Sequence, residues 1–277
     1  MLVCGGLSLS TGGVLVKIVS ADPWQISFYR GITFFLAILL VLSVQYKSSV
    51  FKKFAETGWK GLLIAVAMGI AFCCYVLAMS KTSVANVLFT LNTSPFFAAI
   101  LGLIFIKEHV PKITWLAIFL AMLGTIIMIS ENENITQNIP GGLYALPAAI
   151  SFGIMLVVIR SAPQIDMMPA MCMAALMSCI ISAFVVKNFD IELFDLFICL
   201  GMGAFQVGLG FMLVTWGAKY VSAATAAIYL LLEPILGPVW SWIGIGEIPS
   251  TTTIIGGSII MFAILGKIIF ELKKNEN

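Results

Sequence analysis

Polar side chains that could bind a solute stand inside long apolar runs of this sequence. Glu233 follows Tyr229 by four residues, so the two side chains share one face of a helix. Arg30 and Gln206 lie inside two other apolar runs, Gln206 among several glycines. A charged or strongly polar group in apolar surroundings is costly unless it has a partner. These residues are therefore candidates for holding a polar solute or a proton.

The residue types needed for metal binding or nucleophilic catalysis show no suitable spacing. The six cysteines all fall within apolar runs, and none has the spacing of a zinc site. The single histidine, His109, lies in a short polar connection beside Lys107 and Glu108. The sequence also has no Walker-type phosphate-binding loop. We therefore expect no metal, no cofactor and no catalytic residues.

The composition indicates a membrane protein. Of the 277 residues, 61% are hydrophobic and only 10% are charged, and the mean hydropathy is +1.08. Soluble domains carry about 25% charged residues, so this chain has too little polar surface to face water everywhere. The net charge of +2 is too small to suggest a nucleic-acid partner. The expected partners are the lipid bilayer and a small-molecule substrate, and the oligomeric state stays open.

Ten apolar runs are long enough to cross a bilayer, which takes about 20 helical residues. They are continuous rather than alternating, which favours helices over a β-barrel. The first run lacks the basic start and the cleavage site of a secretory signal, so we interpret it as a spanning helix. The sequence thus predicts an all-α polytopic membrane protein. The expected spans are 2–20, 24–46, 59–80, 83–106, 112–130, 141–160, 166–187, 193–217, 221–246 and 251–270.

The distribution of Lys and Arg predicts the orientation, because these residues are enriched in cytoplasmic connections. With both termini cytoplasmic, Lys17, Arg30, Lys81 and Lys187 stay on the outer side or within the membrane. The short termini and compact size favour a bacterial inner (plasma) membrane. The other eleven of the 15 basic residues then fall inside: Lys47, Lys52, Lys53, Lys60, Lys107, Lys112, Arg160, Lys219, Lys267, Lys273 and Lys274.

An internal repeat runs through the sequence at an offset of 139 residues. Pro95 aligns with Pro234, and Glu108 aligns with Glu247. Each proline therefore stands in the middle of an apolar run and is followed, 13 residues later, by a glutamate at the end of that run. The repeat contains five expected spans, and an odd number of spans inverts the second copy relative to the first. Such inverted repeats are common in secondary transporters.

The segments around both prolines resemble a known family. Leu231–Ile235, running on to Gly246 and Glu247, resembles the second EamA-type repeat of the drug/metabolite transporter superfamily, and Thr93–Phe97 resembles the first. Lys107 stands where a glycine is usual before the glutamate. The resemblance covers nearly the whole chain. It implies a ten-helix fold of two inverted five-helix repeats, residues 1–135 and 136–277, that moves a small metabolite, often outward.

Pro95 and Pro234 mark the expected substrate site. A proline within a helix removes a backbone hydrogen bond and kinks the helix. In lipid the freed carbonyl needs a partner, so such kinks face protein or a wet cavity. Hydrogen bonding between helices is the alternative role for polar residues nearby. The predicted substrate-binding residues are Asn86, Thr90, Thr93, Gln206, Trp216, Tyr229, Glu233 and Arg30.

The predicted function is secondary transport by alternating access, because two inverted halves offer equivalent inward-open and outward-open packings. We expect a small amino-acid-like or amphipathic solute, moved outward. Glu233 could couple transport to protons, could bind a substrate amine, or could pair with backbone freed by Pro234. A polytopic membrane enzyme and a non-transporting receptor or scaffold are the alternatives. The sequence names neither the substrate nor the coupling ion or exchange mode.

Overall fold

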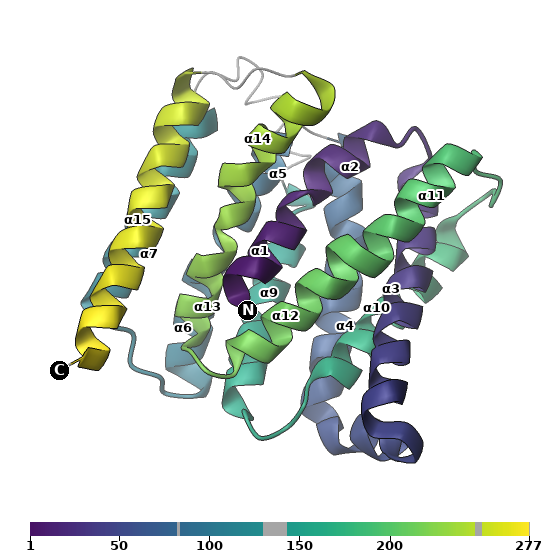
Figure 1. The fold of residues 1–277 in the computed structure, drawn as a ribbon, viewed down its shortest axis with the longest axis horizontal. Helices are drawn as coiled ribbons and strands as arrows, with labels where there is room; N and C mark the ends of the chain where they lie inside the picture. Colours follow the sequence, from purple (N-terminus) through teal and green to yellow (C-terminus); the bar gives the residue numbers. More distant parts are fainter. Residues whose placement is uncertain (82–83, 130–142, 247–250, 277) are drawn as a thin grey trace.

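The computed structural model describes residues 1–81, 84–129, 143–246 and 251–276, and all regular secondary structure in these ranges is helical. Figure 1 shows a bundle of helices that run side by side. Within the described residues, helical elements that continue one another in the same direction group into five spans in each half of the chain. The prediction of an all-α polytopic membrane protein with two five-helix repeats is confirmed.

The first half begins with a broken helix and contains a second broken helix as its fourth span. Its elements are α1 (Leu2–Ser10), α2 (Gly12–Ile18), α3 (Pro23–Tyr46), the short 3₁₀ turn η1 (Lys47–Ser49), α4 (Val50–Lys81), α5 (Val84–Leu91), α6 (Ser94–Phe105) and α7 (Lys112–Ile129).

The second half repeats this plan, with a π-helix inside its third span. Its elements are α9 (Leu146–Ser161), α10 (Met168–Val185), α11 (Leu193–Gly201), the π-helix η2 (Met202–Leu209), α12 (Gly210–Ala218), α13 (Ala223–Leu230), α14 (Leu232–Ile245) and α15 (Thr251–Glu276).

Length and composition make these helices suitable for crossing a membrane. Five helical stretches in the described ranges are long and apolar enough, and four shorter apolar helices accompany them. The stretch Pro23–Lys81 has 59 residues and contains two spans, because the chain turns back at η1. Gly58, with a φ of 54°, adopts a backbone conformation that glycine reaches without steric cost.

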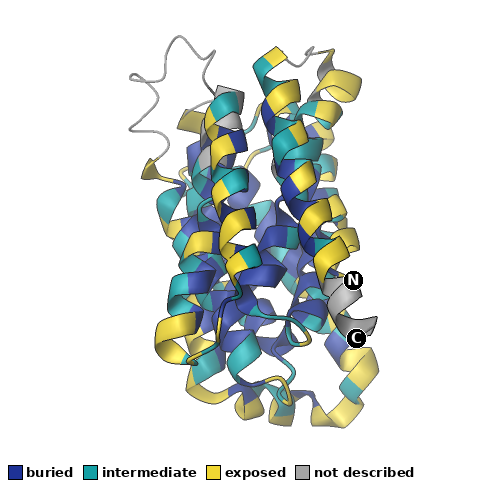
Figure 2. Ribbon diagram, turned by 90° about the vertical axis from the view of Figure 1, so that its left-hand side faces the viewer, coloured by how far each residue is buried: buried dark blue, intermediate teal, exposed yellow. Residues whose placement is uncertain are grey.

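The outer faces of the helices are apolar, and the interior is tightly packed. Figure 2 shows buried residues in the middle of the bundle and exposed residues along its outside. Large side chains on that outside include Phe184, which is 87% exposed, and Phe262, which is 73% exposed. A water-soluble protein rarely exposes apolar area on this scale. Lipid is the solvent that such a surface fits.

Local capping fixes where α3 begins. The Asp22 carboxylate accepts a hydrogen bond from the Trp24 amide at 2.9 Å, and the Gln25 side chain accepts one from the Asp22 amide at 2.9 Å. These two bonds satisfy amides that have no partner inside the helix. Pro23 occupies the first helical turn, where its missing N–H costs no hydrogen bond.

Connections that the sequence assigns to the same side of the membrane contact one another. At one end, the Ser20 amide donates to Asp195 at 3.1 Å, and the Gln25 amide group donates to the carbonyl of Asn188 at 2.9 Å. At the other end, the Tyr46 hydroxyl donates to the Asp166 carboxylate at 2.7 Å. The alternation of connections between the two ends therefore follows the ten-span prediction.

Glu108 ties the two halves together at one end of the bundle. Its Oε1 accepts from Arg160 Nε at 2.9 Å, and its Oε2 accepts from the Ala223 amide at 3.2 Å. Arg160 Nη1 also donates to the Lys219 carbonyl at 3.0 Å. Glu108 follows α6, Arg160 lies in the last turn of α9, and Ala223 begins α13. The carboxylate thus neutralises a cation and caps a helix N-terminus in the other half.

We predict that Glu108→Ala lowers the free energy of unfolding by about 1–3 kcal/mol, because Arg160 loses its counter-charge and the first amide of α13 loses its acceptor. Thermal melting of the purified protein in detergent measures the change. Glu56→Ala is the matched control, since Glu56 forms only a partly exposed ion pair with Lys53, worth about 0–1 kcal/mol. Equal melting temperatures for the two variants would contradict the bridging role of Glu108.

Candidate functional site

In each half, the span that contains the repeated proline is interrupted in the middle, at positions related by the sequence repeat. The first break separates α5 from α6, and the second separates α13 from α14. Pro95 is the second residue of α6, and Pro234 is the third residue of α14. Proline is tolerated in a first helical turn, so each helix resumes just before its proline instead of bending at it. The side chain of Pro234 lies outside the described residues.

Backbone groups at the breaks are paired locally. Both the amide and the hydroxyl of Thr93 donate to the carbonyl of Thr90, at 3.1 and 2.6 Å. At the second break, the Leu231 amide donates to the carbonyl of Ile228 at 3.1 Å. In a continuous α-helix, each of these carbonyls would accept from the amide four residues ahead. At the breaks they accept from the residue three ahead instead, so they stay paired.

The two broken spans cross in an antiparallel manner. The second half-helix of the first break, α6, packs against α13, while α5 packs against α14. Figure 1 shows α5 and α14 towards one end of the bundle and α6 and α13 towards the other. Two further pairs of repeat-related spans also pack together, α3 with α10 and α7 with α15. The two halves are therefore inverted relative to each other.

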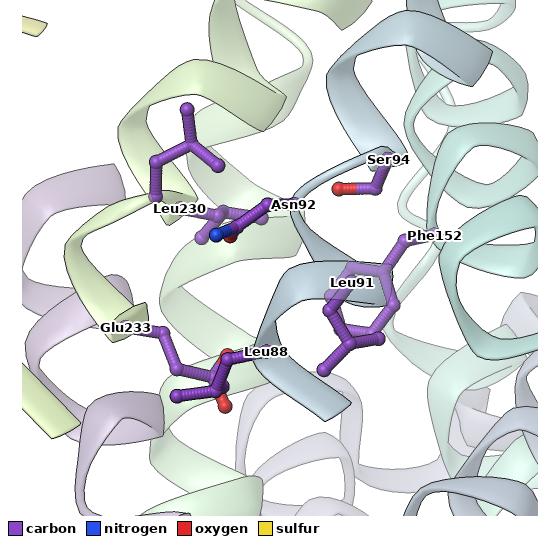
Figure 3. Close-up of a pocket in the computed structure, with 8 residues that line it drawn as sticks. Leu88, Leu91, Asn92, Ser94, Phe152, Leu230 and Glu233 are labelled. Atoms are coloured by element: carbon purple, nitrogen blue, oxygen red, sulfur yellow. The ribbon is translucent and has the colours of Figure 1, made fainter. Parts of the chain in front are cut away.

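A pocket lies between the breaks. Figure 3 shows side chains from both broken spans and from α9 around it. Ser94, at the start of α6, and Glu233, at the start of α14, are related by the offset of 139 residues and both line it. The lining residues are Leu88, Leu91, Asn92, Ser94, Phe152, Leu230, Leu231 and Glu233.

A second pocket adjoins the first and shares Leu91, Phe152 and Glu233 with it. We call the two pockets together the central cavity. The second pocket is lined by Leu9, Arg30, Ala71, Phe72, Tyr75, Leu91, Phe152, Gln206, Val207, Phe211 and Glu233.

A chain of contacts connects the basic and acidic groups of the central cavity. Arg30 is 4% exposed, and its Nη2 donates to the carbonyl of Phe72 at 2.9 Å. Its guanidinium carbon lies 5.9 Å from the centre of the Tyr75 ring. The Tyr75 hydroxyl in turn donates to Glu233 Oε1 at 3.3 Å. Arg30 and Glu233 thus line the same cavity, with Tyr75 in contact with both.

Gln206 reaches the cavity from the π-helix η2. Its Nε2 donates to the carbonyl of Leu9 at 3.1 Å. Its Oε1 is buried and has no hydrogen-bond partner among the described residues. A Cβ atom on Gly12 would lie 2.7 Å from Gln206 Nε2 and 3.2 Å from the Tyr75 hydroxyl, so only a glycine leaves both side chains where they are. π-Helical turns often occur at functional sites.

Aromatic rings form the apolar wall of the cavity. The ring centres of Phe72 and Phe211 lie 5.1 Å apart, and those of Phe152 and Phe211 lie 5.4 Å apart. Phe34 packs behind them, 5.4 Å from Phe72. Aromatic packing of this kind holds the rings in fixed positions. The cavity therefore combines a rigid apolar side with a few polar groups, as ligand sites usually do.

Three of the predicted substrate-binding residues, Arg30, Gln206 and Glu233, come together at the central cavity. Thr90 and Thr93 lie at the first helix break, next to the residues that line it. Trp216 and Tyr229 pack against the hydrophobic core. These four are outside the set that lines the two pockets. Asn86 belongs to α5, and its side chain lies outside the described residues.

Sequence reasoning did not identify Tyr75 or the phenylalanines of the aromatic wall. Tyr75 stands in an apolar run, as Tyr229 does, and a hydroxyl in such a place was the available signal. Phe72, Phe152 and Phe211 carry no such signal, because the chain has 20 phenylalanines and many of them face outward. Within the described ranges, no three His, Cys, Asp or Glu side chains gather closely enough to hold a metal ion.

Comparison with known protein families decides the identity of this fold. The model of the EamA-like transporter family matches the chain twice, over residues 1–130 and 139–268. The chain belongs to the EamA-like transporter family. This family assignment agrees with the resemblance to the drug/metabolite transporter superfamily that the two proline-containing segments carry.

Among the relatives of this EamA-like protein, one is named as an exporter and another as an uptake transporter. A pseudopaline exporter of Pseudomonas aeruginosa (strain UCBPP-PA14) is 21% identical, over 96% of this chain and 93% of that protein. An S-adenosylmethionine uptake transporter of Rickettsia bellii (strain RML369-C) is 25% identical, over 97% of this chain and 91% of that protein. A crystal structure with 14% sequence identity superposes with a TM-score of 0.75, covering 94% of this chain and 92% of that one, and shares the fold.

Gly203 sets how closely the EamA-like bundle packs beside Arg30. A Cβ atom there would overlap the Thr33 hydroxyl and the Arg30 carbonyl of α3. We predict that Gly203→Ala destabilises the fold by about 1–3 kcal/mol, because η2 must move away from α3.

Gly201→Ala is the matched control in the same span, since nothing lies within 4 Å of its added Cβ. This variant should melt at or slightly above the temperature of the parent, because alanine favours helix by about 1 kcal/mol. Thermal melting of both variants decides the point. A Gly203→Ala protein as stable as Gly201→Ala would show that the α3–η2 contact is not tight.

Proposed function

We propose that this protein is a secondary transporter that carries a small amphipathic solute with an anionic and a cationic group, such as an amino acid. The observation that best supports this proposal is that the central cavity borders both helix breaks and is lined by Arg30 and Glu233. Interrupted helices from two inverted repeats around a central site are the arrangement that alternating access uses.

Arg30 is the proposed partner of the anionic group. Its guanidinium is buried, and its contacts with the Phe72 carbonyl and the Tyr75 ring supply partial negative charge only. In the described part of the chain, no carboxylate forms an ion pair with it. A buried cation without a full counter-charge is costly. A solute carboxylate supplies that charge and suits the planar guanidinium fork.

Glu233 is the proposed partner of the cationic group and the proposed proton carrier. It borders both pockets, and one of its oxygens accepts from Tyr75. A carboxylate at this depth is favoured only when a cation or a proton accompanies it. Binding of a solute ammonium and binding of a proton therefore compete for the same group. The rings of Phe72, Phe152 and Phe211 suit the apolar part of the solute.

The proposed movement is a rocking of the inverted halves about the central cavity. Because the halves are inverted, exchanging their conformations converts an inward-open state into an outward-open one. We propose export with both termini cytoplasmic, which the Lys and Arg distribution and the exporter among the relatives support. Because another relative is named for uptake, the direction of transport has to be measured on this protein.

Counterflow in proteoliposomes tests the proposed function. Vesicles containing the purified protein are loaded with an unlabelled solute and given a trace of the labelled solute outside. A panel of amino acids, sugars and cationic drugs is tested, and transient accumulation of label is expected for amino acids. Label must be recovered chemically unchanged, because turnover of the solute would indicate an enzyme. Absence of counterflow for every solute in the panel contradicts transport.

We predict that Arg30→Met lowers kcat/KM for a carboxylate-bearing solute by at least about tenfold, because the solute loses its charged partner. Replacing a buried charge by an apolar residue of similar size is often neutral for stability, so the variant should still fold. Lys187→Met, which removes an exposed charge between α10 and α11, is the control and should transport like the parent. Equal loss in both variants would argue against a specific role of Arg30.

We also predict that Glu233→Gln abolishes the response of transport to an imposed pH gradient. Glutamine keeps the size of the side chain and an acceptor for Tyr75, but it cannot release a proton. Counterflow needs no net driving force, so the variant should still show it, with a higher KM because the solute ammonium loses its counter-charge. Glu192→Gln, an exposed position before α11, is the control. If the Glu233→Gln variant responds to the pH gradient as the parent does, Glu233 is not the proton carrier, and the proposal of transport is unaffected.

A further inference from the structure

Gln206 is buried, and only one of the two polar atoms of its side chain has a hydrogen-bond partner among the described residues. Its side chain is 7% exposed and lines the central cavity. The amide nitrogen has a partner in the Leu9 carbonyl, whereas Oε1 has none among the described residues. Buried acceptors in folded proteins are nearly always paired. The position therefore calls for a donor that arrives from the cavity.

The orientation of the Gln206 amide follows from its neighbours. A carbonyl can only accept a hydrogen bond, so the NH₂ group must face Leu9, and Oε1 must face away from it. The span that carries Gln206 is held close to α3 at Gly203. Gly12 leaves no space behind the amide, because even a Cβ there would lie 2.7 Å from Nε2. The acceptor is thus held in a fixed direction.

The other polar groups of the second pocket leave Glu233 as the companion of Gln206. The Tyr75 hydroxyl already donates to Glu233, and the N–H groups of Arg30 that do not donate to the Phe72 carbonyl are assigned by the proposed function to the solute carboxylate. Gln206 Oε1 and the Glu233 carboxylate are therefore two acceptors on the wall of one cavity. Tyr75 and Gln206 both abut Gly12, and Tyr75 contacts Glu233, which brings the two acceptors into the same neighbourhood.

We infer that Gln206 and Glu233 together select solutes whose cationic group is a primary ammonium and reject quaternary ammonium. This inference rests on the proposed function and names the substrate class of the same site. A primary ammonium has N–H donors for both acceptors, whereas a trimethylated nitrogen has none. A site with a buried polar group discriminates strongly against a ligand that leaves the group unpaired. Gln206 is thus the specificity-determining residue for the cationic group.

Matched pairs of probes test the inference. The probes are L-phenylalanine, L-methionine and 2-phenylethylamine, each with its N,N,N-trimethyl analogue. Their apparent affinities for the purified protein are obtained from ligand-dependent thermal stabilisation, since a ligand that binds the folded state raises the melting temperature. We expect the primary ammonium to bind roughly tenfold or more tightly than its trimethyl partner, as a hydrogen bond to a charged donor implies.

Gln206→Met removes the acceptor and keeps the length of the side chain, so the ratio of the two affinities should fall by roughly tenfold. Gln45→Met, at an exposed position near the end of α3, should leave the ratio unchanged. Gly12→Ala displaces the amide without altering its chemistry and should reduce the ratio as well. It replaces the first variant if Gln206→Met does not fold.

Each outcome is decisive. An affinity ratio in Gln206→Met equal to that of the parent, or equal binding of both members of each pair by the parent, overturns the inference. If none of the probes binds while other solutes show counterflow, the inference fails and the proposed transport stands. If no solute in the panel shows counterflow and no probe binds, both fail together.

Discussion

The absence of water in the lipid core is the constraint on which this architecture depends. Every backbone N–H and C=O there must find a partner within the protein, and unbroken helices meet that need. The two proline-containing spans related by the sequence repeat nevertheless stop and restart at mid-length. Thr93 and Leu231 pair with carbonyls three residues back, and the breaks face each other across a cavity. Irregular backbone is tolerated where it is buried in protein or lines a cavity, and the breaks stand in such a place.

Buried charged side chains are under the same constraint, because each of them also needs a partner within the protein. Arg30 and Glu233 stand on separate spans, and Tyr75 mediates between them with its ring and its hydroxyl. Glu108, by contrast, sits at one end of the bundle and is fully engaged by Arg160 and by the amide of Ala223. A charged residue whose partners within the protein neutralise it, such as Glu108, has a structural role. A buried charged residue without a full counter-charge, such as Arg30, can bind a charged ligand.

The fold was largely predictable from sequence, because hydropathy reports helices that face lipid and the Pro95–Pro234 match reports the duplication. Arg30, Gln206 and Glu233 were predictable for the same reason, since polar groups stand out against an apolar background. Tyr75 carried the same kind of signal, but its contact with Glu233 was not predictable, because it joins residues that are 158 positions apart. The helix breaks preceding each proline, and the π-helix, depend on packing between spans that no local pattern records.

The π-helix has a consequence for how the length of this span can change. A π-turn accommodates one residue more than an α-turn does, and each residue of an α-helix turns the chain by about 100°. Deleting one residue from Met202–Leu209 would let the π-helix close to an α-helix, so α12 would keep its rotation and Phe211 would stay in the aromatic wall. A single-codon deletion at this place therefore preserves the face that α12 presents, whereas the same deletion in a regular α-helix of this protein would turn every later side chain of that helix.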